Sequence, residues 1–219
     1  MVINEERRKA IFVHIPKTGG VSVERSIHKA LGGNEYIIYP KLIGVPPRPL
    51  VKNCRGLGLH STLREYRRYY GQSINDFYKF SIIRNPWRRL VSHYEYILIP
   101  GWNKRMNVNN KLTFSQFVQL SKTYQFGYSM PNGYDEYLRD DYETQMDFVF
   151  KLENINEDLP KAGLGFKLDI KEVLHMNSTL DIHKEHKNWK DYYNPGLIDR
   201  VYKIYKNDIE KYNYEFEEA

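Results

Sequence analysis

Cysteine is almost absent from this sequence, and long apolar runs are absent altogether. Cys54 is the only cysteine among 219 residues, which excludes a disulfide within the chain and favours a reducing compartment. No stretch approaches the roughly 20 apolar residues that a membrane-spanning helix needs. The first ten residues are charged, and no apolar core of a secretory signal follows them. We therefore expect a cytoplasmic protein without a membrane span.

Patterns typical of several other protein classes are also missing. The sequence has no Lys/Arg run and no recognition motif of the kind that nucleic-acid-binding proteins carry, so we expect no nucleic-acid partner. Three histidines (His175, His183 and His186) are not accompanied by cysteines or carboxylates at zinc-site spacing, so we predict no metal site. No internal repeat or low-complexity segment divides the chain.

The composition that remains is that of a globular protein with a modest positive charge. Hydrophobic residues make up 41% of the chain and aromatic residues 15%, which is typical of a folded protein. The length allows one substantial core, so we predict a single domain over residues 1–219. The 33 basic and 27 acidic residues give a formal net charge of +6, which is compatible with anionic ligands and equally with an ordinary solvated basic surface.

The most informative stretch is residues 11–22. Residues 11–15 have the apolar pattern of a buried strand, Pro16 ends ladder pairing, and Gly19 and Gly20 permit a tight turn with positive φ. Apolar residues then recur at helical spacing at Val23, Ile27, Ala30 and Leu31. Such a turn brings backbone N–H groups and the positive end of a helix dipole together, which predicts a phosphate or sulfate cradle.

Side chains of the same turn fit an anion as well. Lys17 adds a full positive charge, and Thr18 and Ser22 add hydroxyl groups. The lysine precedes the glycines, whereas the lysine of a Walker A loop follows them, so this is not a Walker A loop. A purely structural turn would explain the Lys-Thr-Gly-Gly segment equally well.

A second strand and helix follow at residues 78–94. The strand ends on the basic residue Arg84, Asn85 is suited to cap the next helix, and Pro86 suits the first helical position. Ser92 shares a helix face with Asn85, at a distance of about 10 Å along the axis for a rise of about 1.5 Å per residue. Arg84 and Ser92 could therefore hold one anion between them; the alternative is a surface arginine and a neutral helix serine.

The remaining elements are expected from caps and apolar patterns. Residues 34–59 form an irregular stretch that is either a substrate-facing loop or a long connection. We expect a helix that begins after Ser61 or Thr62, with Glu65 completing its cap. Three further predictions are a short helix near 113–120, a third strand at 148–153, and one helix from Asn194-Pro195 to Ile209.

Two of these segments resemble motifs of a known family. Residues 12–22 resemble the 5′-phosphosulfate loop of sulfotransferases, and residues 80–94 resemble their 3′-phosphate motif. The resemblance is strongest to carbohydrate sulfotransferases, including the heparan sulfate 2-O type and bacterial relatives. Weaker similarities occur at residues 60–65, 150–154 and 189–193, so the resemblance covers nearly the whole chain, from residue 11 to about residue 216.

The resemblance implies a P-loop-like α/β fold in three layers, with a central parallel sheet flanked by helices. It also implies the donor 3′-phosphoadenosine 5′-phosphosulfate, the product 3′-phosphoadenosine 5′-phosphate, and no metal. The residues implied for the 5′ end of the donor are Lys17, Thr18, Gly19, Gly20, Val21 and Ser22, although relatives often carry Thr or Ser where this chain has Val21. The 3′-phosphate would be held by Arg84 and Ser92. The implied catalytic base is His60, with His14 as the alternative.

We therefore expect a sulfotransferase that moves a sulfuryl group to an acceptor hydroxyl, most simply that of a carbohydrate. The acceptor would attack in line with the leaving group, His60 would take its proton, and Lys17 would neutralise the charge that develops on the leaving oxygen. One alternative is a nucleotide-dependent phosphotransferase, although the Walker A order and an evident Asp pair for magnesium are missing. The other is a non-catalytic module that binds a nucleotide or a glycan.

Overall fold

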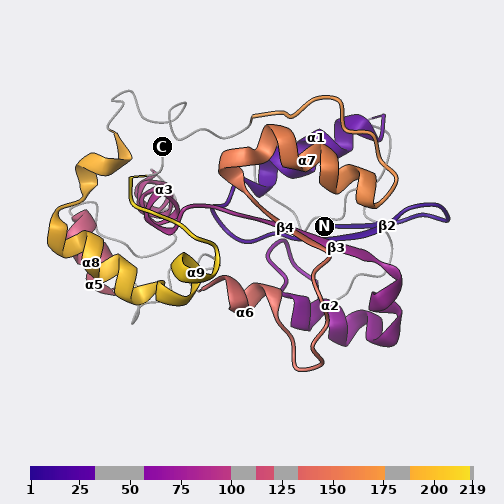
Figure 1. The fold of residues 1–219 in the computed structure, drawn as a ribbon, viewed down its shortest axis with the longest axis horizontal. Coiled ribbons are helices and arrows are strands. Elements are labelled where there is room, and N and C mark those ends of the chain that lie inside the picture. Colours follow the sequence, from indigo (N-terminus) through magenta and orange to yellow (C-terminus); the bar gives the residue numbers. More distant parts are fainter. Residues whose placement is uncertain (33–56, 100–111, 121–132, 176–187, 218–219) are drawn as a thin grey trace. The chain divides into compact units, whose positions relative to one another are not determined.

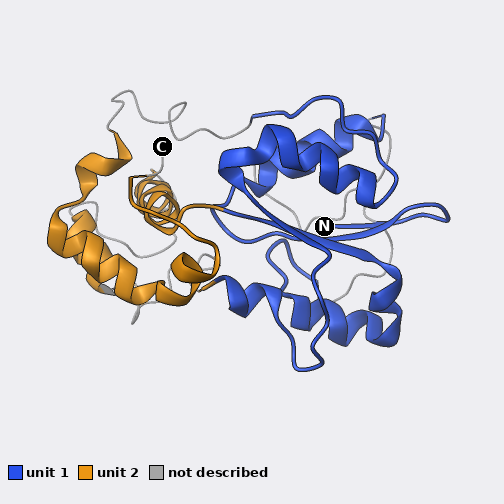
Figure 2. Cartoon of the chain, in the orientation of Figure 1, with its two compact units in different colours: residues 1–83, 134–176 blue, residues 84–133, 177–219 orange. Residues whose placement is uncertain are grey.

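The computed structural model describes residues 1–32, 57–99, 112–120, 133–175 and 188–217 (Figure 1). The chain divides into two compact units, residues 1–83 with 134–176 and residues 84–133 with 177–219 (Figure 2). The single domain over residues 1–219 stays a prediction. Several residues considered above lie outside the described part: most of 34–59 with Cys54, and His183 and His186.

The first unit contains the four strands found in the described ranges. Its elements are β1 (Val2–Asn4), β2 (Lys9–Val13), α1 (Gly20–Ala30), α2 (Leu63–Tyr70), the 3₁₀ helix η1 (Gly71–Asp76), β3 (Tyr78–Ile83), α6 (Tyr134–Leu138), β4 (Phe148–Lys151), the 3₁₀ helix η2 (Leu152–Asn154) and α7 (Ile155–Gly165). The second unit contains α3 (Pro86–Leu98), α5 (Phe114–Leu120), the 3₁₀ helix η4 (Trp189–Tyr192), α8 (Pro195–Ile204) and α9 (Lys206–Lys211).

The sheet is mixed and its strands follow the order β1-β2-β3-β4. Strands β2, β3 and β4 are parallel, with Phe12 opposite Phe80 and Phe80 opposite Phe148. The parallel α/β core is therefore confirmed. The sheet is not parallel throughout, because the edge strand β1 pairs antiparallel with β2 through a short charged turn. The carboxyl ends of β2 and β3 lie at the same edge, which places the segment after Val13 there.

Helices cover both faces of this sheet in the first unit. Figure 1 shows α1 and α7 along one face and α2 along the other. Apolar residues alternate along the strands, so that one set meets α1 and α7. This core contains Ala10, Phe12, Val23, Ile27, Phe80, Ile82, Phe150, Ile155, Leu159 and Ala162. The three-layer arrangement expected from the resemblance is thus present.

The second unit is helical and rich in aromatic contacts. The ring of Phe114 lies 5.0 Å from that of Tyr193 and 5.3 Å from that of Tyr94, centroid to centroid. The short helix predicted near 113–120 is confirmed as α5. The prediction of one helix from Asn194-Pro195 to Ile209 is wrong. Helix α8 ends at Ile204, and α9 begins at Lys206. Tyr205 between them departs from helical geometry, with φ −112° and ψ 24°. No helix in the described ranges has the length and apolar character to cross a bilayer.

Candidate active site

The loop between β2 and α1 has the backbone expected of an anion cradle. Lys17 and Gly19 both have positive φ, 65° and 86° respectively, which turns the chain sharply before the helix. Gly19 is the N-cap of α1 and has no side chain to accept from the first N–H groups of the helix. Those groups and the positive end of the helix dipole are suited to an anion.

At both glycines of the loop a neighbouring side chain lies too close to leave room for a Cβ. A Cβ on Gly19 would lie 2.6 Å from Leu152 Cδ1, just after β4. A Cβ on Gly20 would overlap the imidazole ring of His14. The loop therefore rests against one side chain from η2 and one from the end of β2.

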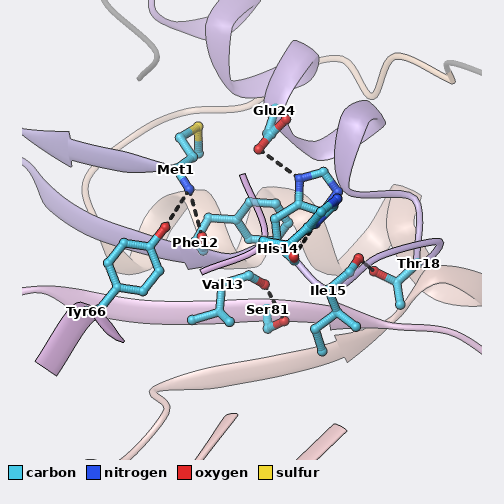
Figure 3. A network of polar contacts seen from close by, with 10 residues as sticks. Met1, Phe12, Val13, His14, Ile15, Thr18, Glu24, Tyr66 and Ser81 are labelled. Carbon is cyan, nitrogen blue, oxygen red and sulfur yellow. Dashed lines mark hydrogen bonds and ion pairs between the residues drawn. The ribbon is translucent and has the colours of Figure 1, made fainter. Parts of the chain in front are cut away.

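The hydroxyl of Thr18 has a structural partner. Its Oγ1 donates to the backbone carbonyl of Ile15 at 2.9 Å, and the residue is fully buried (Figure 3). Because a hydroxyl has one proton to donate, this bond shapes the loop, and Thr18 is left with its backbone N–H for an anion. Ser22 lies in the first turn of α1 and is also buried.

His60 and the loop belong to the same unit and are joined through His14. His60 precedes the N-cap of α2 by two residues, and its Nδ1 lies 2.9 Å from the backbone oxygen of His14. The two imidazole rings meet edge to face, with centroids 4.8 Å apart and an interplanar angle of 80°. Both histidines that the sequence singled out therefore lie beside the cradle, at the carboxyl end of β2.

Glu24 completes this group from the second turn of α1. Its Oε1 lies 3.0 Å from His14 Nδ1, and each of the two side chains is only 4% exposed (Figure 3). Burial, followed by the positive charges of the Met1 amino group and Lys17, lowers the pKa of His14 to about 3. The His14 ring is therefore neutral near pH 7, and His14 is a poor candidate for a base that must accept a proton.

Neighbouring contacts hold the strand end in place. The Ser81 hydroxyl of β3 donates to the Val13 carbonyl at 2.7 Å, which ties the last residue of β2 to the adjacent strand. The Met1 amino group donates to the Phe12 carbonyl at 2.9 Å and to the Tyr66 hydroxyl at 3.0 Å, so α2 is bound to the same strand (Figure 3). The backbone just before His14 is thus held by the Ser81 hydroxyl at Val13 and by the Met1 amino group at Phe12.

The second predicted anion site lies in the other unit. Arg84 directly precedes the N-cap of α3, and Ser92 is a buried residue within that helix. Asn85 caps α3 as predicted: its Oδ1 accepts from Trp87 N at 3.1 Å, and its Nδ2 donates to the Glu215 carbonyl at 2.8 Å. The described residues contain no group of three or more side chains that could hold a metal ion.

Glu24 was not recognised as a site residue in the sequence, although a signal for it exists. Positions 20, 23, 24 and 27 are the i, i+3, i+4 and i+7 positions of one helix face. That face is buried in the structure. A glutamate there is a charged residue on an apolar face, which is the pattern of a buried polar partner.

Comparison with known proteins points to one family. Residues 1–215 match the model of a family described as the Sulfotransferase family. An uncharacterized protein of Archaeoglobus fulgidus is 34% identical over 110 residues, which are 48% of this chain and 84% of that protein. The crystal structure of mouse sulfotransferase SULT7A1 complexed with PAP has a TM-score of 0.57 at 13% identity, covering 94% of this chain and 85% of that chain. At this identity the structural likeness shows a shared fold.

Proposed function

Because the chain belongs to the sulfotransferase family, we propose that it moves a sulfuryl group from 3′-phosphoadenosine 5′-phosphosulfate to a carbohydrate hydroxyl. One observation carries the proposal. The β2–α1 loop, with its positively charged Lys17 and uncapped helix N-terminus, lies in contact with a histidine pair that includes His60. Anion cradle and base are the two parts that such a transfer requires.

The choice of donor is supported by the motifs and by the fold. The mouse structure that shares the fold was solved with PAP, the desulfated form of this donor. In this chain the loop from Lys17 to Ser22 would hold the 5′ end of the nucleotide. Arg84 and Ser92 would hold the 3′-phosphate, for which the planar guanidinium of arginine offers two parallel donors.

The reaction is a single in-line displacement. The acceptor oxygen forms a bond to sulfur, the bond between sulfur and the bridging phosphate oxygen breaks, and His60 takes the hydroxyl proton. The electron pair of the broken bond stays on the phosphate oxygen. Lys17 and the N–H groups of the loop neutralise that charge, and no metal is assigned a part.

The carbohydrate acceptor rests on the resemblance of the two motifs to carbohydrate sulfotransferases. The formal net charge of +6 is compatible with an anionic glycan. A panel of glycans and simple phenols, each offered with labelled donor, would identify the acceptor. Transfer to a phenol and to no glycan would contradict this part of the proposal and leave the donor assignment intact.

Nucleotide binding is the first test of the donor. The unfolding midpoint is measured with 3′-phosphoadenosine 5′-phosphate, with ATP, and with adenosine 5′-monophosphate. A ligand at 100 times its dissociation constant adds about 2.7 kcal/mol to the free energy of unfolding, which is easily observed. We expect a shift with the 3′-phosphorylated nucleotide alone; an equal shift with ATP, and turnover that needs magnesium, would favour the phosphotransferase.

The variant Arg84→Ala tests whether this arginine contacts the 3′-phosphate, by comparing its binding of two nucleotides that differ in that group. It should weaken binding of the 3′-phosphorylated nucleotide by about tenfold or more, since a charge-assisted hydrogen bond contributes about 1.5–3 kcal/mol. It should leave the weaker binding of adenosine 5′-monophosphate unchanged. Arg139, an exposed residue of the first unit, serves as the control position in Arg139→Ala. Equal weakening of both nucleotides in the Arg84 variant would argue against a 3′-phosphate contact.

A further inference from the structure

His14 and Glu24 form a buried pair, and neither residue has a role in the proposed reaction as described above. We propose that both are positioning residues for His60: Glu24 orients the His14 ring, and His14 orients His60 so that its Nε2 takes the acceptor proton. The inference rests on the proposed function, because it presumes that His60 is the base. Its evidence, however, is the geometry of three side chains in one unit.

The first step concerns the proton on His60. Its Nδ1 lies 2.9 Å from the backbone oxygen of His14, and a carbonyl oxygen can only accept a hydrogen bond. Nδ1 must therefore carry the proton. Since a neutral imidazole has one N–H and one lone pair, the lone pair is on Nε2, and Nε2 is the basic nitrogen.

The second step concerns the orientation of the His60 ring. The edge-to-face contact with His14, at 4.8 Å and 80°, places one imidazole against the other. The His14 ring is itself held on another side by the backbone of Gly20, where a Cβ would overlap it. His14 therefore contacts both the first residue of α1 and the His60 ring, and in this proposal it sets the position of the base relative to the cradle.

The third step explains the carboxylate. Glu24 and His14 are almost fully buried, and a carboxyl group out of water costs free energy that an aliphatic side chain would not. Packing alone therefore gives no reason for a glutamate at this position. Its Oε1 lies 3.0 Å from His14 Nδ1, a hydrogen bond that fixes the rotation of the ring. In the proposal Nδ1 carries the proton of this bond and the carboxyl oxygen accepts it.

The consequence is a chain of contacts that runs from α1 to the base. For an imidazole that binds a metal, loss of the outer hydrogen bond that orients it typically costs about 10- to 100-fold, and we expect the same scale here. A similar loss follows when a reacting group is misplaced by about 1 Å. The charge on Lys17 and the loop N–H groups do not depend on Glu24, so binding of the desulfated nucleotide should be spared.

Nitrogen-15 NMR of the histidine rings in the full chain tests the first and third steps directly. Long-range proton–nitrogen correlations distinguish a ring protonated on Nδ1 from one protonated on Nε2. We expect both His60 and His14 to carry their proton on Nδ1 in the wild-type protein at neutral pH. A proton on Nε2 of either ring would overturn the inference. The NMR measurement requires neither a variant nor an active enzyme.

The variant Glu24→Gln tests the coupling to turnover. We expect kcat to fall by about 10- to 100-fold and the dissociation constant of 3′-phosphoadenosine 5′-phosphate to change by less than about twofold. The His14 ring should show both tautomers, because an amide can donate to Nδ1 as well as accept from it. Glu172→Gln is the matched control, because it removes a carboxylate that pairs with Lys29 at the other end of α1. That control should change neither kcat nor the His14 spectrum.

The outcomes separate this inference from the proposed function. A folded Glu24→Gln protein with wild-type kcat and an unchanged His14 spectrum would overturn the positioning role. A wild-type protein that binds no donor nucleotide and transfers no sulfuryl group would overturn the proposed function, while the histidine spectra would still report the tautomers. If Glu24→Gln does not fold, the wild-type spectrum alone decides the first and third steps.

Discussion

Lys17 combines the charge of the cradle with an unfavourable backbone conformation. Its φ of 65° lies in the left-handed region, which costs a residue with a Cβ about 1–2 kcal/mol. Glycine would avoid this cost but would lack the amino group. The residue thus retains a local strain at the position where the proposed reaction needs a positive charge.

Two substitutions at this residue separate the conformation from the charge. Lys17→Gly should be more stable than Lys17→Ala by about 1 kcal/mol, because alanine keeps the penalty of the left-handed conformation. Both should lose turnover by about 100-fold or more, since each removes the charge beside the leaving oxygen. Denaturant unfolding and sulfuryl transfer measure the two effects. Equal stability of the variants would show that Lys17 is not strained in solution.

His60 should be needed for turnover and not for the nucleotide. His60→Ala should reduce kcat by about 100-fold or more, the usual contribution of a general base, and should bind 3′-phosphoadenosine 5′-phosphate normally. His175→Ala is the control, because His175 is an exposed histidine of the same unit whose Nε2 bonds to Asn156. Near-normal turnover of the His60 variant would place the base elsewhere.

At the residue level the loop was predictable because a glycine turn after a strand has a local signature, whereas His60 and His14 were named only through the family resemblance. The sequence did not reveal that Glu24 pairs with His14, since that contact depends on how α1 lies over the end of β2. Nor did it show that the Thr18 hydroxyl donates to Ile15 rather than outwards. Local patterns name candidate residues, whereas hydrogen-bond partners are decided by packing.

Among the elements, α2 has a complete capping box, and its N-cap Thr62 lies two residues after His60. Thr62 Oγ1 accepts from Glu65 N at 3.3 Å, and the Glu65 side chain accepts from Thr62 N at 2.7 Å. Thr62→Ala should therefore lower the free energy of unfolding by about 1 kcal/mol, as measured by denaturant titration. Thr62→Ser keeps the oxygen and should stay within a few tenths of a kcal/mol of the wild type. Equal losses in both variants would mean that the methyl group matters instead.

Elements with a side-chain cap or a clear apolar pattern were predictable, whereas a three-residue strand and a break inside an apolar stripe were not. Asn85 with Pro86, and Thr62 with Glu65, mark the starts of α3 and α2 in the sequence and in the structure. Strand β1 was missed because only Val2, Ile3 and Asn4 form it, and its pairing with β2 is a tertiary contact. The break at Tyr205 was missed because the apolar stripe continues through it.

For the molecule as a whole, the buried histidine predicts sensitivity to acid. Burial and the positive charges of Met1 and Lys17 lower the pKa of His14 from 6.5 to about 3, and the groups facing this ring are Glu24 and His60. Between these two pH values the unfolded chain binds a proton that the folded protein does not. The stabilisation is therefore fully present above pH 6.5 and decreases as the pH falls towards 3.

The expected slope is that of one proton. Between about pH 6 and pH 4.5 the wild type should lose about 1.4 kcal/mol of unfolding free energy per pH unit more than His14→Phe/Glu24→Leu, which lacks the titrating imidazole and its buried partner. His175→Ala should keep the wild-type slope. Denaturant titrations at several pH values measure the difference, and parallel curves for the wild type and the double variant would show that His14 does not titrate in this way.

A Cβ at position 20 would overlap the His14 ring. Substitutions at these two positions are therefore tolerated in one order and not in the other. Alanine at position 20 is obstructed while His14 is present, and this overlap is removed once a small residue replaces that histidine. The histidine can be lost first, whereas the glycine cannot. A lineage that leaves this arrangement therefore has one open route, which begins by giving up the imidazole.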